Sequence, residues 1–184
     1  MADFKIIIPF ILNAEGGYVN NPSDNGHETN KGVTWATWVV FYGDTTASHN
    51  QFLAMPPDQW GNIFKAGYWD KIYGGAINSQ RVANMIADWV WTSGTYYPEE
   101  HIQQLINHIF KKHLAVDWVF GPATIDSINS ADEELLYQNL FLRRIQYYHD
   151  VVEMAQSKGD HSQDQFLQGW LDRVSRLIEF NMQF

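Results

Sequence analysis

Apolar residues recur at helical spacing through most of this chain. The clearest stretch opens with Pro-Glu-Glu at residues 98–100 and closes with Lys-Lys-His at residues 111–113, the charge order that a helix dipole prefers. Its apolar residues form one stripe: Ile102, Leu105, Ile106, Ile109 and Phe110. Alternating runs are too short to require a sheet, and residues 116–120 are the one small candidate for a strand. The sequence therefore predicts a mainly α fold.

Capping residues and chain breaks place the other helices. Thr34, Ser79 and Asp132 are each expected to cap a helix, because a short hydroxyl or carboxylate side chain accepts a backbone N–H of the first turn. The expected helices cover residues 4–14, 35–41, 58–68, 82–92, 98–113, 122–128, 133–158 and a last one that begins at 160 or 162 and ends near 180. Most of residues 42–57 is polar and is expected to form an irregular loop.

The stretch from residue 13 to residue 38 carries the polar groups that suggest chemistry. Glu15 follows an apolar run, and Gly16-Gly17 is expected to end that helix. The C-terminal end of a helix carries partial negative charge, so a carboxylate there is unfavourable for stability. With apolar residues behind it, its carboxyl group is expected to keep its proton, as a general acid must. On position alone, a solvated carboxylate after a helix stop is the simpler interpretation.

The rest of this stretch favours a site. Proline and glycine break it into turns between two apolar segments, and Asp24, Thr29 and Thr34 are small polar groups suited to holding a water or a sugar hydroxyl. Asp24 can equally cap the turn Ser-Asp-Asn-Gly, which is an everyday use of aspartate. Both roles of Asp24 remain open from the sequence.

Three motifs here resemble a known family. Glu-Gly-Gly-Tyr begins at Glu15, Pro-x-Asp ends at Asp24, and Thr-Asn-x-Gly-Val-Thr begins at Thr29. Together they resemble the signature of glycoside hydrolase family 108, N-acetylmuramidases also described as secretion activator proteins. Later segments resemble the same family in the same order at residues 66–70 and 87–94, and segments after residue 120 resemble the predicted peptidoglycan domain that follows it.

The resemblance implies a lysozyme-like helical fold. Residues 1–95 would form the muramidase catalytic region, and residues 96–184 a helical, predicted peptidoglycan-binding region packed against it. The implied reaction is hydrolysis of the β-1,4 bond between N-acetylmuramic acid and N-acetylglucosamine, with Glu15 as the catalytic acid. The spacing of these residues also resembles the Glu, Asp and Thr set of phage-type lysozymes. This resemblance implies that Asp24 and Thr29 position or activate the attacking water, with Thr34 as the second choice for the threonine.

Sugar-binding residues are expected among the aromatic side chains, because a flat ring stacks on the apolar face of a pyranose. The candidates for the substrate cleft are Tyr18, Thr34, Trp35, Tyr68 and Trp69. The chain departs from the family at His27, which stands where glycine is usual, and at Trp91, which stands where asparagine is common. These departures keep open a non-catalytic wall-binding or secretion-linked module on the same fold. A chitin-directed glycosidase is a third possibility.

Composition argues against other classes of function. The net charge of −9 disfavours nucleic acid as a partner, and the chain has no cysteine for a thiolate site. The seven histidines form no His-x-x-x-His pattern, so we expect neither a metal nor a cofactor. Arg143, Arg144 and Arg173 could bind the carboxylates of a stem peptide. Their ordinary interpretation is as charged residues on the outer faces of two packed helices.

The sequence also carries expectations about location. No segment approaches the ~20 apolar residues of a membrane span, and the first residues lack the basic region of a secretory signal. We therefore expect no membrane insertion and synthesis in the cytoplasm without a Sec signal. Reaching peptidoglycan glycan strands would then require a holin, a secretion system or lysis. We also expect a monomer.

Overall fold

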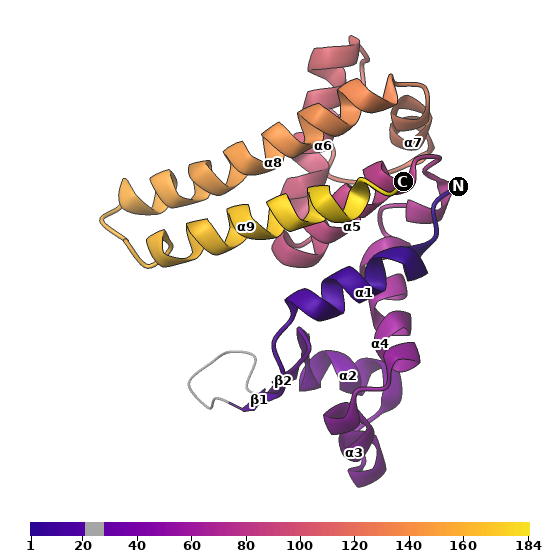
Figure 1. Ribbon diagram of the computed structural model, residues 1–184, viewed down its shortest axis with the longest axis vertical. Coiled ribbons are helices and arrows are strands. Elements are labelled where there is room, and N and C mark those ends of the chain that lie inside the picture. Colours follow the sequence, from indigo (N-terminus) through magenta and orange to yellow (C-terminus); the bar gives the residue numbers. More distant parts are fainter. Residues whose placement is uncertain (21–27) are drawn as a thin grey trace. The chain divides into compact units, whose positions relative to one another are not determined.

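The computed structural model describes residues 1–20 and 28–184, and this part of the chain is mainly α with one small sheet (Figure 1). The chain divides into two compact units. The first unit is Lys5–Tyr68, and the second combines Met1–Phe4 with Trp69–Phe184. The mainly α fold expected from the sequence is confirmed.

The unit Lys5–Tyr68 holds short helices and the sheet. Its elements are α1 (Phe4–Ala14), β1 (Val19–Asn20), β2 (Glu28–Asn30), β3 (Val33–Thr34), α2 (Trp35–Tyr42), α3 (Thr46–Ala54) and α4 (Pro57–Phe64), followed by a π-helical turn at Lys65–Trp69. The strands pair antiparallel in the order β1-β2-β3, so Thr29 of the central strand faces Val19 on one side and Thr34 on the other. Each strand has only two or three residues, too few to show alternation in the sequence.

Helix α3 corrects the expectation of a loop between residues 42 and 57. Thr45 caps it, because its side-chain oxygen accepts the backbone N–H of Ser48 at 3.1 Å. Ser48 and Phe52 are its buried residues, and Ser48 Oγ accepts the indole N–H of the buried Trp38 at 3.0 Å. A helix that buries only one apolar and one small polar residue leaves a weak pattern in the sequence, which is why the sequence does not indicate α3.

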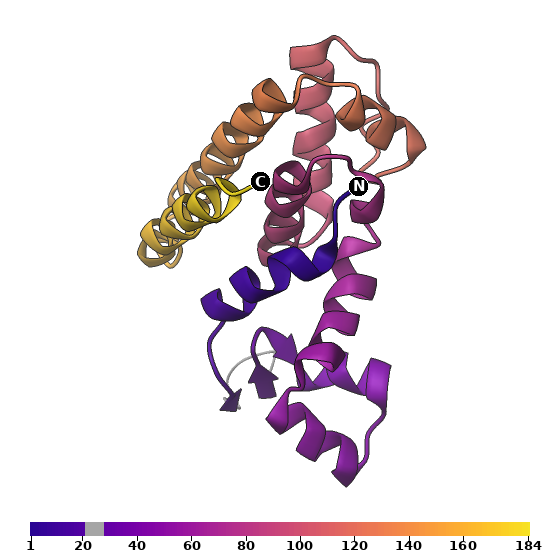
Figure 2. The ribbon, with the colours of Figure 1, turned by 45° about the vertical axis from the view of Figure 1, so that its right-hand side comes forward.

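The second unit is built from longer helices. They are α5 (Gln80–Ser93), α6 (Tyr96–Phe110), α7 (Pro122–Asn129), α8 (Glu133–Gln156) and α9 (Asp164–Asn181), with a 3-10 turn at Gly74–Ala76. Helices α8 and α9 run side by side in opposite directions, and α5 packs against α6, α8 and α9 (Figures 1 and 2). The predicted caps are confirmed, since Thr34, Ser79 and Asp132 accept backbone N–H groups of α2, α5 and α8.

Residues 116–120 do not form the strand that the sequence suggested. The segment instead runs beside α6, whose amide side chains take up its backbone groups. Asn107 bonds both the N–H and the C=O of Leu114, and Gln103 Oε1 accepts the N–H groups of Asp117 and Trp118. Within residues 116–120, the Gln103 side chain thus bonds backbone groups that a neighbouring strand would otherwise bond, and Asn107 does the same for Leu114 just before them.

The interior of the second unit contains a charged network that corrects a sequence expectation. Arg144 is fully buried rather than on an outer helix face, and its Nη2 lies 2.8 Å from Oδ2 of the fully buried Asp88. Arg173 reaches the other oxygen of Asp88 at 2.8 Å. Burial by itself would raise the pKa of Asp88, but the two guanidinium groups outweigh it and lower that pKa. Arg143 does pair with Asp150 near the surface, as expected, at 3.5 Å.

Within the two described ranges, none of the helices combines the length and the apolar character needed to cross a lipid bilayer.

Candidate active site

Glu15 ends helix α1 in the unit Lys5–Tyr68. Its backbone N–H donates to the carbonyl of Ile11 at 3.1 Å, and the residue is half-buried. Gly16 and Gly17 follow and are exposed, and among the described atoms nothing lies within 4 Å of where their Cβ atoms would stand. The sequence therefore places Glu15 where a ligand can approach past two residues that carry no side chains.

Tyr68 is a candidate residue whose pKa is changed by the charge of Glu15. Burial raises the pKa of the Tyr68 phenol, and the negative charge of Glu15 raises it further. The Tyr68 ring stacks on Phe64 with centroids 6.2 Å apart. A half-buried phenol beside the carboxyl group is suited to hold a sugar hydroxyl or to orient the acid.

Thr29 and Thr34 face each other across β2 and β3, but their side chains are placed differently. The Thr34 hydroxyl is already engaged, because it accepts the N–H of Thr37 at 3.1 Å and lies 3.0 Å from the Thr37 hydroxyl. Thr29 is half-buried in the central strand. Thr29 therefore remains the better candidate for a water-holding hydroxyl, while Thr34 has a capping role.

Tyr18 belongs to a polar chain that the sequence did not reveal. Its hydroxyl donates to Oε1 of Glu28 at 2.6 Å, and both carboxylate oxygens of Glu28 lie 3.0–3.1 Å from Nε2 of His49. The hydrogen bond from Tyr18 lowers the pKa of Glu28 most, and the bond from His49 adds to it. His49 comes from α3, a helix that the sequence did not indicate, so no local signal pointed to this contact.

Trp35 stands against this polar chain. Its ring meets the His49 ring edge-on at 4.9 Å and the Phe52 ring at 5.3 Å, and Tyr18 contacts Phe52 at 6.4 Å. Tyr18 is 44% exposed and Trp35 is half-buried. The structure thus brings these two sequence candidates into one aromatic cluster with accessible ring surface.

Trp69 is placed differently from the other aromatic candidates. It belongs to the second unit, is 2% exposed and packs against Phe4 with ring centroids 6.4 Å apart. Gly74 lies so close that a Cβ there would stand 2.5 Å from the Trp69 ring. This enclosure gives Trp69 a packing role, so we leave it out of the proposed cleft. Asp24 and His27 lie outside the described residues.

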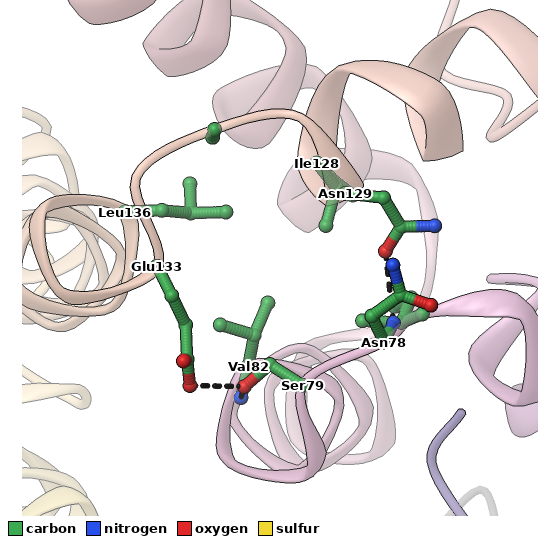
Figure 3. Close-up of a pocket in the computed structure, with 9 residues that line it drawn as sticks. Asn78, Ser79, Val82, Ile128, Asn129, Glu133 and Leu136 are labelled. Carbon is green, nitrogen blue, oxygen red and sulfur yellow. Dashed lines mark hydrogen bonds between the residues drawn. The ribbon is translucent and has the colours of Figure 1, made fainter.

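Among the described residues we also looked for a metal site and for a ligand pocket. These residues contain no group of three or more His, Cys, Asp or Glu that could hold a metal ion. A pocket of about 260 Å³ lies where the start of α5 meets the loop between α7 and α8 (Figure 3). Its polar groups bond one another, Asn129 Oδ1 to the N–H of Asn78 and Glu133 Oε1 to the hydroxyl of Ser79. Because these polar groups already bond one another, we interpret the pocket as a gap in the packing.

The chain is similar to known proteins over most of its length. Residues 8–94 match the family Glycosyl hydrolase 108, and residues 97–175 match the family Predicted Peptidoglycan domain. The solved structure of Brucella abortus SagA is similar, with 25% identity, a TM-score of 0.71, and coverage of 98% of this chain and 94% of that chain. Among curated proteins, none matches this chain.

These two matched regions define a glycoside hydrolase with peptidoglycan as its polymer. The chain carries a glycosyl hydrolase 108 region at residues 8–94, followed by a predicted peptidoglycan domain at residues 97–175.

Proposed function

We propose that the protein is an N-acetylmuramidase that cleaves the β-1,4 bond between N-acetylmuramic acid and N-acetylglucosamine, with Glu15 as general acid. The observation that carries this proposal is the place of Glu15. It is a half-buried carboxyl group at the C-terminal end of α1, followed by two open glycines and electrostatically coupled to Tyr68. A general acid must reach the glycosidic oxygen, and the two glycines leave space beside the carboxyl group for a glycan to approach.

The proposed reaction begins with proton donation. Protonated Glu15 gives its proton to the glycosidic oxygen, the bond from that oxygen to the muramic acid C1 breaks, and positive charge develops on the sugar ring. A water adds to C1 and gives its proton to the carboxylate of Asp24, which completes hydrolysis. We assign the orientation of that water to Thr29 and to Asp24, which lies outside the described residues.

The second glutamate of this unit is suited to a different task. Glu28 accepts hydrogen bonds from Tyr18 and lies within bonding distance of His49, and its pKa is lowered. A carboxylate held in this way stays ionised at neutral pH and cannot supply a proton. We assign Glu28 to holding Tyr18 in the cleft, where the exposed part of the Tyr18 ring can meet a sugar.

The decisive experiment replaces Glu15 by glutamine, which keeps the size of the side chain and removes the proton donor. Release of soluble fragments from purified peptidoglycan is measured for Glu15→Gln and for the exposed control Glu153→Gln. General acid help is typically worth ~10²–10⁴ in rate, so turnover of Glu15→Gln should fall by that order while its melting temperature holds or rises. A Glu15→Gln enzyme within a few-fold of wild type would exclude this role.

The bond that is cut and the role of Asp24 need separate measurements. Muramic acid at the new reducing ends identifies a muramidase, and turnover of chitin would instead favour the chitin-directed alternative. If Asp24 handles the water, Asp24→Asn should lower turnover more than tenfold with little change in substrate binding. If Asp24 only caps a turn, the melting temperature falls and the remaining folded enzyme works normally.

A further inference from the structure

Four aromatic rings follow one another on the second unit. The Trp118 and Tyr96 rings stack with centroids 4.9 Å apart, Tyr96 meets Tyr97 edge-on at 5.1 Å, and Tyr97 lies 6.4 Å from Tyr147. Trp118, Tyr96 and Tyr97 are 41%, 49% and 53% exposed. We call these four residues the ring row. Exposed aromatic side chains gathered in this way mark a binding surface more often than isolated ones do.

Trp118 combines an exposed ring with a strained backbone conformation. Trp118 has φ of 62°, the left-handed region that a bulky side chain rarely adopts. The buried Gln103 maintains it, because Gln103 Oε1 accepts the N–H groups of Asp117 and Trp118 while its Nε2 donates to Asp117 and Val119. Backbone strain of this kind persists where surrounding bonds impose it, and it gathers at functional sites.

The ring row leads to a pocket between α6 and the C-terminal end of α8. The pocket has a volume of about 570 Å³, and Tyr97 and Tyr147 line it. Val151 and Met154 give it apolar walls, and its charged lining consists of three acidic residues and one lysine: Glu100, Asp150, Asp160 and Lys158. The ring row and the pocket together therefore offer flat ring surfaces and, beside them, space for a ligand group that carries both positive and negative charges.

We propose that the ring row and this pocket form a peptidoglycan-binding site on the second unit, the unit that does not contain Glu15. The exposed rings would stack on the apolar faces of successive sugars, and their hydroxyl and indole N–H groups would bond sugar hydroxyls. The pocket would take the stem peptide, with Glu100 and Asp150 facing its ammonium group and Lys158 a carboxylate. This rests on the proposed function for the identity of the polymer, and Tyr97, Trp118 and Tyr147 all fall within the matched peptidoglycan region.

The test measures binding of full-length protein to insoluble peptidoglycan sacculi. Every variant carries Glu15→Gln to prevent cleavage. Trp118→Gly removes the ring without straining the backbone, because glycine adopts positive φ freely. Tyr97→Ala removes the ring that joins the row to the pocket. Each change should weaken binding about tenfold, which corresponds to ~1.4 kcal/mol.

Tyr73→Gly is the matched control, because Tyr73 is 49% exposed and has φ of 51° but lies outside the ring row. It should bind like the parent. Equal binding by Trp118→Gly, Tyr97→Ala and the parent would overturn the site, as would an equal loss in Tyr73→Gly. Glycan strands stripped of peptide should bind more weakly than intact sacculi, and equal affinity would overturn the assignment of the pocket.

A separate readout keeps this inference apart from the proposed function. Turnover of short soluble muropeptides is measured with Glu15 intact, in the wild type and in Trp118→Gly. Both should cleave them equally, because the ring row is not part of the proposed catalytic machinery. If the wild type cleaves nothing while Trp118→Gly still loses sacculus binding, the proposed function fails and the binding site stands.

Discussion

Replacing Asp88 by asparagine should remove a large part of the stability of the second unit. Asp88 and Arg144 have fully buried side chains, and their charged atoms are 2.8 Å apart. The substitution keeps the shape but leaves the Arg144 guanidinium facing a neutral amide in the interior. Breaking a buried ion pair from one side costs about 3–5 kcal/mol. At roughly 2–4 °C per kcal/mol for a chain of this size, the melting temperature should fall on the order of 10 °C.

The assay is guanidinium chloride unfolding followed by circular dichroism and by tryptophan fluorescence, to which the neighbouring Trp89 contributes. Asp150→Asn is the control, because its pair with Arg143 is 3.5 Å long and the two side chains are 44% and 28% exposed. An exposed pair is worth less than ~1 kcal/mol. The reasoning is refuted if Asp88→Asn costs no more than Asp150→Asn.

Three further predictions concern stability. Burial, with the charge of Asp117, raises the pKa of Glu99 from 4.5 to about 7. The folded state therefore holds a proton that the unfolded state has released, so stability should fall by about 1–3 kcal/mol between pH 4.5 and 8. Melts across this range should show a flatter profile for Glu99→Gln, and an unchanged slope would contradict the assignment. Gly74→Ala places a Cβ 2.5 Å from the Trp69 ring and should cost about 1–3 kcal/mol in thermal melts. Gly75→Ala, 3.7 Å from that ring, should cost much less, and equal losses would exclude the steric cause. Thr34→Ala removes the cap of α2 and should cost ~1 kcal/mol in denaturant unfolding, whereas an unchanged midpoint would show that the cap contributes little.

The sequence predicted those features that depend on neighbours along the chain. Thr34, Ser79 and Asp132 were recognisable as caps because each bonds a backbone N–H three residues further on. Helix α1 was predicted over its full length, Phe4–Ala14, because an apolar run stops at Glu15 and two glycines. The family motifs also lie in short local segments, which is why the order of residues alone is enough to reveal the resemblance.

Features that depend on residues far apart in the chain were not predictable in this way. The three strands are too short to carry a pattern. Residues 116–120 form no strand, because Gln103 of α6 bonds the backbone groups of Asp117, Trp118 and Val119. His49 meets Glu28 across 21 residues, from a helix that the sequence did not indicate.

Arg144 and Arg173 show most clearly what the tertiary structure decided. In the sequence they are ordinary charged residues on two helices, with acidic residues nearby on the same helices. Their carboxylate partner, Asp88, lies 56 and 85 residues away on α5. Local sequence determines where a helix begins and ends and which of its faces is apolar, because capping and apolar spacing act over three or four residues. Which charges become buried depends on which helix faces come together, and only the packed structure settles that.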